Sequence, residues 1–303
     1  MKVFKLILKI CLCLILVALL AVSAVFFGYY PHYRTAKKPV EFTAAAREGE
    51  GIDVMSCNVR CLNPGDLGKR SWFYRADLIM KNIESVKPSI IGFQEVTKWQ
   101  YKYLSDCMVG FDSVIEYRDE TPYAEGCPIF YRTDCYTLVD KGSFWLSETP
   151  EKMSKDWDSA CYRICSYVIL KDNATEKEFV VFNTHLDHVS EEARINGIGV
   201  VLDKIAQFGG LPSMIMGDFN CFEGSVTYNK VTENFLDAQY QTENTMHGAT
   251  YQAFGEKLDY ETIDFFMISK TGIKVSELKI INTTYDGVYP SDHFPIFAKF
   301  ELD

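Results

Sequence analysis

The feature that most constrains this chain is a set of short apolar runs, each of which ends in or contains a polar side chain. In residues 213–220, a run of strand length is followed by Gly217, Asp218 and Asn220. Alternation along a strand would place Asp218 and Asn220 on the same face, and in a turn they would still lie within a few ångströms of each other. Because these residue types are also common in turns, this stretch alone does not separate a turn from a functional site.

The other runs predict an α/β domain, and 303 residues with 48% hydrophobic content can bury a large core. Runs at 52–58 and 89–95 flank a segment at 72–86 whose apolar residues recur at helical spacing until Pro88. A strand, a helix and a strand in this order predict two strands of one sheet. Three further strands, at 111–117, 127–131 and 136–145, are expected to pair in a hairpin-like way, and strands at 164–170 and 178–183 are expected to form a hairpin. Two more strands are expected at 262–268 and after 290. Helices are expected at 98–107 and 191–208.

The first 40 residues differ from the rest and predict a membrane segment. An uncharged run from 10 to 30 lies between two flanks that together carry six Lys and Arg residues. Its length matches the ~20 residues that cross a bilayer. Residues 22–24 would suit signal-peptide cleavage, but cleaved apolar regions usually run ~7 to 15 residues. We therefore expect a retained anchor within 1–40, a linker at 41–50 and one catalytic domain at 51–303, outside the cytoplasm; a cleaved, secreted form is the alternative.

The charge of the domain argues against a large surface for nucleic acid. Six of the 31 Lys and Arg residues fall in the first 40 residues, which carry no Asp or Glu. Residues 41–303 therefore hold 25 basic against 41 acidic residues, a net charge of −16. A domain of this charge repels a long polyanion unless a local basic patch overrides the field.

The polar residues at the strand ends suit one kind of chemistry. Each has a structural alternative as a turn residue, a helix cap or a buried histidine with satisfied nitrogens. Asp264 is the hardest to explain this way, because a carboxylate beside Phe265 is costly to bury without a cation or a donor such as a His ring. Oxygen ligands without a CxxC motif suit Mg²⁺ or Mn²⁺ held together with substrate phosphate. The set comprises Asn58, Glu95, His185, Asp218, Asn220, Asp264, Asp292 and His293.

In sequence order, these motifs resemble those of the endonuclease/exonuclease/phosphatase superfamily. They are Asn58 after a strand, Phe93-Gln94-Glu95, Asn183-Thr184-His185-Leu186-Asp187, Gly217-Asp218-Phe219-Asn220, Ile263-Asp264-Phe265 and Ser291-Asp292-His293. The resemblance covers about 52–303. It implies a four-layer α/β sandwich, in which two mixed sheets pack face to face with helices outside. It also implies Mg²⁺-dependent hydrolysis of phosphoester bonds, with Mn²⁺ as an alternative cofactor.

The resemblance further implies a role for each residue. Glu95 and Asp292 would bind the metal, with Asn58 in its shell. Asp218 would position or activate water, and Asn220 would hold the water or the phosphate. His185 would stabilise the transition state, and His293, paired with Asp264, would do the same or act as the base.

Departures from the family patterns limit the choice of substrate. Arg60 stands where abasic-site endonucleases typically carry an acidic residue, which makes the metal site less anionic and suits a phosphate. The Trp-Cys-Asp-Arg signature of inositol polyphosphate 5-phosphatases is replaced by residues 289–293. Segments at 72–75, 144–147 and 185–194 look most like a bacterial branch of the superfamily. We also expect Arg60, Arg70, Arg75 and Arg163 to gather around the site, with Arg60 and Arg163 binding phosphate.

Three functions follow as hypotheses. The leading one is a membrane-anchored phosphodiesterase or phosphatase that acts on a phosphorylated small molecule or a lipid headgroup. The second is a secreted or membrane-anchored nuclease, although nucleic acid is the less expected partner. The third is a non-catalytic protein that binds a phosphorylated ligand, and retention of every ionisable residue argues against it. The membrane is expected to be contacted through residues 10–30, and the chain to act as a monomer.

Overall fold

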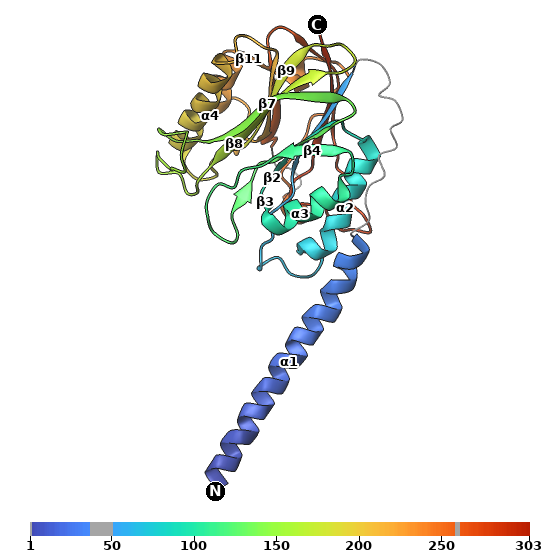
Figure 1. The fold of residues 1–303 in the computed structure, drawn as a ribbon, viewed down its shortest axis with the longest axis vertical. Coiled ribbons are helices and arrows are strands. Elements are labelled where there is room, and N and C mark those ends of the chain that lie inside the picture. The colour runs from blue at the N-terminus through green and yellow to red at the C-terminus, as the bar shows by residue number, and fades with distance from the viewer. Residues whose placement is uncertain (1, 37–50, 258–260) are drawn as a thin grey trace.

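The computed structural model describes residues 2–36, 51–257 and 261–303, so the linker expected at 41–50 lies outside the described residues. Helix α1 (Lys2–Ala36) extends away from the rest of the molecule (Figure 1). Its segment Lys2–Tyr30 is long and apolar enough to cross a membrane, and its most apolar window is not buried against the domain. Near its end, Tyr29 packs against Phe73, with ring centroids 5.9 Å apart. An apolar surface of this size is not left in water, which fits either an anchor or a signal sequence.

Two six-stranded sheets form the described part of the domain. The first has the order β13 (Ile273–Ile280), β14 (Ile296–Leu302), β1 (Ile52–Asn58), β2 (Ile90–Gln94), β6 (Ile129–Arg132) and β4 (Phe111–Val114). The second has the order β11 (Phe235–Asp237), β12 (Asp264–Ser269), β10 (Ser213–Asp218), β9 (Glu178–His185), β8 (Ile164–Asp172) and β7 (Tyr136–Trp145). A small pair joins β3 (Val96–Thr97) to β5 (Glu125–Gly126). Both large sheets are mixed, because β1 runs parallel to β2 and β9 runs parallel to β10.

Helices cover the outer faces of the sheets. In Figure 1, α2 (Trp72–Val86) and α3 (Lys98–Cys107) lie on one side of the domain and α4 (Glu191–Ala206) lies on the other. The short α5 (Val226–Thr232) packs beside α4. Apolar side chains accordingly cluster between the sheets, between the first sheet and α2 and α3, and between the second sheet and α4 and α5. The four-layer α/β sandwich expected from the motifs is confirmed.

Alternation along each strand decides which layer a side chain enters. In β1, Val54 faces the inter-sheet core, whereas Met55 packs with the helical layer. In β10, Met216 faces the inter-sheet core and Ile215 faces α4. The same parity puts the last residue of each strand, Asn58 and Asp218, on the inner side. The two sheets therefore present polar side chains to each other at one common edge.

The expected hairpin-like pairing between residues 111 and 145 is only partly correct. β4 pairs antiparallel with β6 in the first sheet, but β7 pairs with β8 in the second. The chain crosses from one sheet to the other directly after β6. The local pattern indicates that a strand exists, but the buried surface of the whole domain decides which strand it pairs with. The hairpin of β8 and β9 is as expected, whereas α5, β11 and β13 were not predicted.

Candidate active site

The strand ends of both sheets meet at one site. Asp218, at the end of β10, is the register partner of His185 at the end of β9 and of Asp264 at the start of β12. Asn58, at the end of β1 in the other sheet, donates a hydrogen bond from Nδ2 to Oδ2 of Asp218 at 3.0 Å. The parallel pairing of β9 with β10 and the inward parity of their last residues thus bring distant parts of the sequence together.

Gly217 permits the close approach of β9 and β10 immediately before Asp218. Its φ of +142° is rarely adopted by residues with a side chain. A Cβ atom at this position would lie 1.9 Å from the backbone oxygen of Thr184. The glycine of the Gly217-Asp218 pair is therefore required by packing, independently of any chemistry.

Asp218 lies at the centre of the site and is 1% exposed. Its Oδ2 lies 3.4 Å from Nε2 of His185 and 3.6 Å from Nε2 of His293. Its Oδ1 accepts a hydrogen bond from the backbone N–H of Asn220 at 3.0 Å. Burial and the nearby Asp264 outweigh the charge of His293 and raise the pKa of Asp218 to about 7. A carboxylate with this pKa can exchange a proton at neutral pH, as a general base must.

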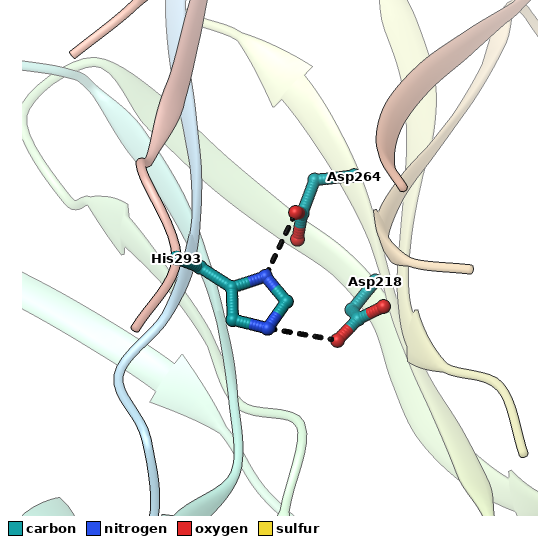
Figure 2. Close-up of side chains that lie close together, drawn as sticks. All are labelled: Asp218, Asp264 and His293. Atoms are coloured by element: carbon teal, nitrogen blue, oxygen red, sulfur yellow. Dashed lines mark hydrogen bonds and ion pairs between the residues drawn. The ribbon is translucent and has the colours of Figure 1, made fainter. Parts of the chain in front are cut away.

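The two histidines differ in charge. Figure 2 shows His293 between two carboxylates, with Nδ1 2.9 Å from Oδ2 of Asp264 and Nε2 facing Asp218. Burial would lower the pKa of His293, but Asp264 and Asp218 raise it to about 10, so the ring is a cation. Burial and the charge of Arg163 hold the pKa of His185 well below its usual value, so that ring is neutral. Both rings therefore lie beside Asp218, and His293 is positively charged whereas His185 is neutral.

A second group of oxygen ligands lies on the first-sheet side of the site. Asn58 also donates from Nδ2 to Oε1 of Glu95 at 3.1 Å, and Oδ2 of Asp292 lies 3.6 Å from Nη1 of Arg60. Burial would raise the pKa of Glu95, but the backbone N–H of Cys61 and nearby positive charges keep it below its usual range. Burial and the charge of Glu95 raise the pKa of Asp292. Glu95 and Asp292 therefore lie close enough for the charge of one to disfavour the charge of the other.

These residues fit a hard divalent cation. Glu95, Asp292 and Asn58 offer carboxylate and amide oxygens, the ligands that suit Mg²⁺ or Mn²⁺. Asp218, Asp264 and His293 also bring ligand atoms within 4.8 Å of one another. However, a His293 cation carries a proton on both ring nitrogens and has no lone pair for a metal. The chemistry of the donors thus favours the Glu95 and Asp292 side for the cation.

Backbone strain marks the same site. Arg60, Glu95 and Asn220 each follow the end of a strand, and their φ angles are 56°, 62° and 48°. Non-glycine residues seldom adopt such angles, which cost roughly 1–3 kcal/mol each and persist where the surrounding structure enforces them. At each strand end the chain turns sharply into the site. Hydrogen bonds at 2.9 Å from Arg60 N to Asn58 Oδ1 and from Cys61 N to Glu95 Oε2 stabilise these turns.

A polar link below the site ties the two sheets together. Gln94 of β2 donates from Nε2 to Oδ1 of Asn183 in β9 at 2.7 Å. Asn183 in turn donates from Nδ2 to the backbone oxygens of Phe93 and Pro128 at 2.8 and 2.9 Å. Gln94 and Asn183 are fully buried. Because they fix the spacing of the sheets, they help to set the distance between Asn58 and Asp218. The sequence motifs contained both residues, but their pairing was not predicted.

The site opens into a cavity of about 660 Å³. Of the residues assigned a catalytic, metal-binding or phosphate-binding role, all except the buried Asn58 and Asp264 line it, and these two contact lining residues directly. Five cationic side chains line this cavity, and three of them were not predicted. The cationic lining residues are Arg60, Arg118, Arg163, Arg194 and Lys257.

Arg163 is the most enclosed of these cations, at 5% exposed. Its Nη2 lies 3.0 Å from Nδ1 of His188, and its Nε lies 3.6 Å from Oδ2 of Asp187. Within the described residues, Nε has no hydrogen-bond partner. A guanidinium held in this way at a cavity wall is suited to bind an anionic group of a ligand.

Two of the expected arginines do not reach the cavity. Arg70 pairs with Glu256 on the surface. Arg75 is fully buried beneath the site, where it donates to the backbone oxygens of Val59 and Pro290 at 2.8 Å. The cations that replace them are Arg118 and Lys257, which lie in loops, and Arg194, which lies on α4. Loop residues carry no periodic pattern, so no sequence signal indicated that Arg118 and Lys257 face the site.

Comparison with known proteins adds a separate line of support. A family model described as Endonuclease/Exonuclease/phosphatase family matches residues 55–293. An endonuclease/exonuclease/phosphatase from Bacteroides vulgatus is 32% identical, with a TM-score of 0.79 over 84% of this chain and 99% of that one. A mannosyl-6-phosphatase from Bacteroides thetaiotaomicron is 32% identical, with a TM-score of 0.76 over 83% and 99%. The Ccr4 exoribonuclease subunit of Schizosaccharomyces pombe is 23% identical over 77% of this chain, which spans only 45% of that relative.

Proposed function

The chain belongs to the endonuclease/exonuclease/phosphatase family, and from this premise we propose that it is a Mg²⁺-dependent hydrolase of a small phosphoester. The proposal rests on one arrangement above all. Asp218, a buried carboxylate of pKa about 7, lines one cavity together with the oxygen ligands Glu95 and Asp292 and with five cationic side chains. Such a site can hold a phosphoryl group beside the group that activates water.

The reaction assigned to the site is hydrolysis of one phosphorus–oxygen bond. The water oxygen bonds to phosphorus while its proton passes to Asp218. The bond between phosphorus and the leaving oxygen breaks, and that oxygen takes up a proton from solvent while Asp218 returns its proton to solvent, so that an alcohol and a phosphate are formed. A bound Mg²⁺ would polarise the phosphoryl group and neutralise its charge.

The remaining residues bind and orient the phosphoryl group. His293, a cation held by Asp264, stabilises negative charge that develops on the phosphoryl oxygens, and neutral His185 donates a hydrogen bond. Asn220 is fixed by the bond from its Nδ2 to the backbone oxygen of Leu186 at 3.1 Å and holds the water or the phosphate. Arg60 and Arg163 bind the non-reacting oxygens.

A phosphorylated small molecule, and specifically a sugar phosphate, is the substrate class best supported. The relative named mannosyl-6-phosphatase is 32% identical over nearly its whole length. The cavity of about 660 Å³ suits one phosphate with a compact organic group. A lipid headgroup has the same chemistry, and α1 would keep the domain near a membrane. The net charge of −16 over residues 41–303 disfavours a long nucleic acid.

A nuclease is the second candidate, favoured by the Ccr4 relative. A protein that grips a duplex neutralises several phosphates and loses affinity steeply with salt. Five cations of this chain instead line one cavity, which is too small for a duplex. A non-catalytic protein that binds a phosphorylated ligand would use the same arginines without turnover.

The deciding experiment is an activity panel on the full-length protein in detergent. Sugar phosphates, phospholipids, aryl phosphates and duplex DNA are compared with Mg²⁺ and with EDTA, at ~50 and ~200 mM salt. We expect Mg²⁺-dependent hydrolysis with a higher kcat/KM for a small phosphoester than for DNA. Asp218→Asn preserves shape but cannot take the proton, so turnover should fall by about 10² or more while binding persists.

Three outcomes would overturn these assignments. Efficient, strongly salt-sensitive cleavage of duplex DNA would favour the nuclease. An absence of hydrolysis across the panel would favour the binding protein. Full activity of Asp218→Asn would remove Asp218 from the mechanism.

We also propose that α1 is retained as an anchor, with the domain outside the cytoplasm. Its length and lack of burial support this proposal. Amino-terminal sequencing of the protein from membranes tests retention, and protease protection of intact cells or vesicles tests the orientation.

A further inference from the structure

A second cavity, of about 750 Å³, adjoins the active site. Phe222 and Ile263 line the active-site cavity, and the residues next to them in the chain, Glu223 and Thr262, line the second one. Consecutive Cα atoms are only 3.8 Å apart. The two cavities are therefore neighbours at two separate points, beyond Asn220 on one side and beside Asp264 on the other.

An ordered aromatic shelf forms part of this second cavity. The rings of Tyr240 and His247 lie 5.4 Å apart with an interplanar angle of 33°. The hydroxyl of Tyr240 donates to Oε2 of Glu223 at 2.6 Å, and Nδ1 of His247 lies 3.2 Å from Oε1 of Gln239. Tyr240 is nevertheless 53% exposed. The rings are thus held in place by polar partners while much of their surface stays open to a ligand.

The second cavity differs from the first in its charged side chains, because the first combines cations with the carboxylates of its metal and catalytic residues. Five Lys and Arg side chains line the active-site cavity. Among the described residues that line the second cavity none is Lys or Arg, and Glu223 and Glu261 contribute two carboxylates. A second phosphate, such as the next one in a nucleic acid or a polyphosphate, would be repelled there. Hydroxyl groups would instead donate to the carboxylates and to Gln239, and aliphatic C–H faces would pack on the rings.

We propose that the second cavity binds an uncharged sugar of the substrate's leaving group, so that the substrate is a phosphorylated oligosaccharide rather than a single sugar phosphate. This inference rests on the proposed function for the position of the phosphate. Tyr240 and His247 are specificity-determining residues, and they touch the leaving group away from the broken bond. The phosphate lies among the arginines, and the sugar beyond the phosphorylated one lies on the shelf.

The test compares three substrates on the full-length protein in detergent: p-nitrophenyl phosphate, mannose 6-phosphate, and a mannobiose that carries the 6-phosphate on its non-reducing sugar. Wild type should prefer the disaccharide to mannose 6-phosphate by about 10-fold in kcat/KM. Tyr240→Ala and His247→Ala, made separately, should reduce this preference to near unity without affecting p-nitrophenyl phosphate. Trp99→Ala, which removes a 68% exposed aromatic ring of α3, is the matched control and should keep the preference.

A charge reversal tests the electrostatic part of the inference. Glu223→Lys should raise kcat/KM several-fold for a disaccharide with a second phosphate on the reducing sugar, because the repulsion becomes attraction. Glu84→Lys, on the exposed face of α2, makes the same charge change away from the cavity and should have no effect.

Binding of unphosphorylated mannobiose by calorimetry, without metal, separates the two proposals. Binding that Tyr240→Ala abolishes would support the sugar cavity even if no phosphoester were hydrolysed, in which case only the proposed function fails. The inference would be overturned if wild type had the same kcat/KM for the two mannose substrates, or if both shelf variants kept the wild-type preference. In either case, hydrolysis of p-nitrophenyl phosphate would still support the proposed function. An absence of both mannobiose binding and hydrolysis would overturn both.

Discussion

The buried carboxylate of Asp187 ties three segments to the end of β9, and its removal should weaken the wall of the active site. Asp187 is 2% exposed. Its Oδ1 accepts from the backbone N–H groups of Val189 and Ser190 at 3.0 and 2.9 Å, at the start of α4. Its Oδ2 accepts from the hydroxyl of Ser159 at 3.0 Å and lies 3.6 Å from Nε of Arg163. We therefore expect Asp187→Asn to destabilise the fold even though it preserves the shape of the side chain.

The size of the effect follows from these contacts. The amide replaces one acceptor oxygen by a donor that faces other donors, and it removes the charge opposite Arg163. A hydrogen bond to a charged group contributes ~1.5–3 kcal/mol. Removing one partner of a buried ion pair costs ~3–5 kcal/mol. Because one oxygen remains, we expect a loss of about 3 kcal/mol, which in a domain of this size lowers the melting temperature by about 6–12 °C.

The loss should depend on pH in a defined direction. Burial would raise the pKa of Asp187, but backbone N–H donors and Arg163 hold it well below its usual value. A carboxylate with a depressed folded pKa contributes stability that is fully present above its unfolded pKa of ~3.9 and is lost as the pH falls through the folded pKa. The difference between wild type and Asp187→Asn should therefore be constant near neutral pH and shrink below pH ~4.

The assay is thermal unfolding followed by circular dichroism, on the full-length protein in detergent at pH ~7 and pH ~3.5, on either side of the unfolded pKa. Asp203→Asn, on the exposed face of α4, is the control and should stay within ~0.5 kcal/mol of wild type. The reasoning would be refuted by an Asp187→Asn melting temperature that matches wild type at pH ~7, or by a deficit of the same size at both pH values.

Three further substitutions test other parts of the site. Glu95→Gln should weaken Mg²⁺ affinity and be partly rescued at high Mg²⁺, and an unchanged midpoint in a Mg²⁺ titration of activity would count against Glu95 as a ligand. Gly217→Ala should lower the free energy of unfolding by more than about 3 kcal/mol, because its Cβ would lie 1.9 Å from Thr184 O. A melting temperature equal to that of wild type would show that the two strands can move apart. Arg163→Lys keeps the charge but loses the planar fork, so KM for a phosphoester should rise about 10-fold with little change in kcat, and an unchanged KM would place the substrate elsewhere.

The sequence by itself determined the fold class and the residues at the centre of the site. Side-chain alternation and helical spacing are local properties, so they predicted β1, α2 and β10 from their own residues. A carboxylate within an apolar run has to be compensated, and on that ground Asp264 was expected to need a partner such as a His ring. The structure places His293 at 2.9 Å from it.

Only the tertiary structure decided how elements far apart in the sequence combine. The neighbouring strands β6 and β7 enter different sheets, and the buried pair Gln94 and Asn183 then fixes the spacing between the sheets. Arg75 was expected at the site but lies buried beneath it. Arg118, which had no recognisable pattern, lines the cavity. The physical reason is that a local pattern specifies only which face of a strand is apolar. The partner of a strand, and the direction of a long charged side chain in a loop, depend instead on contacts between residues far apart in the sequence.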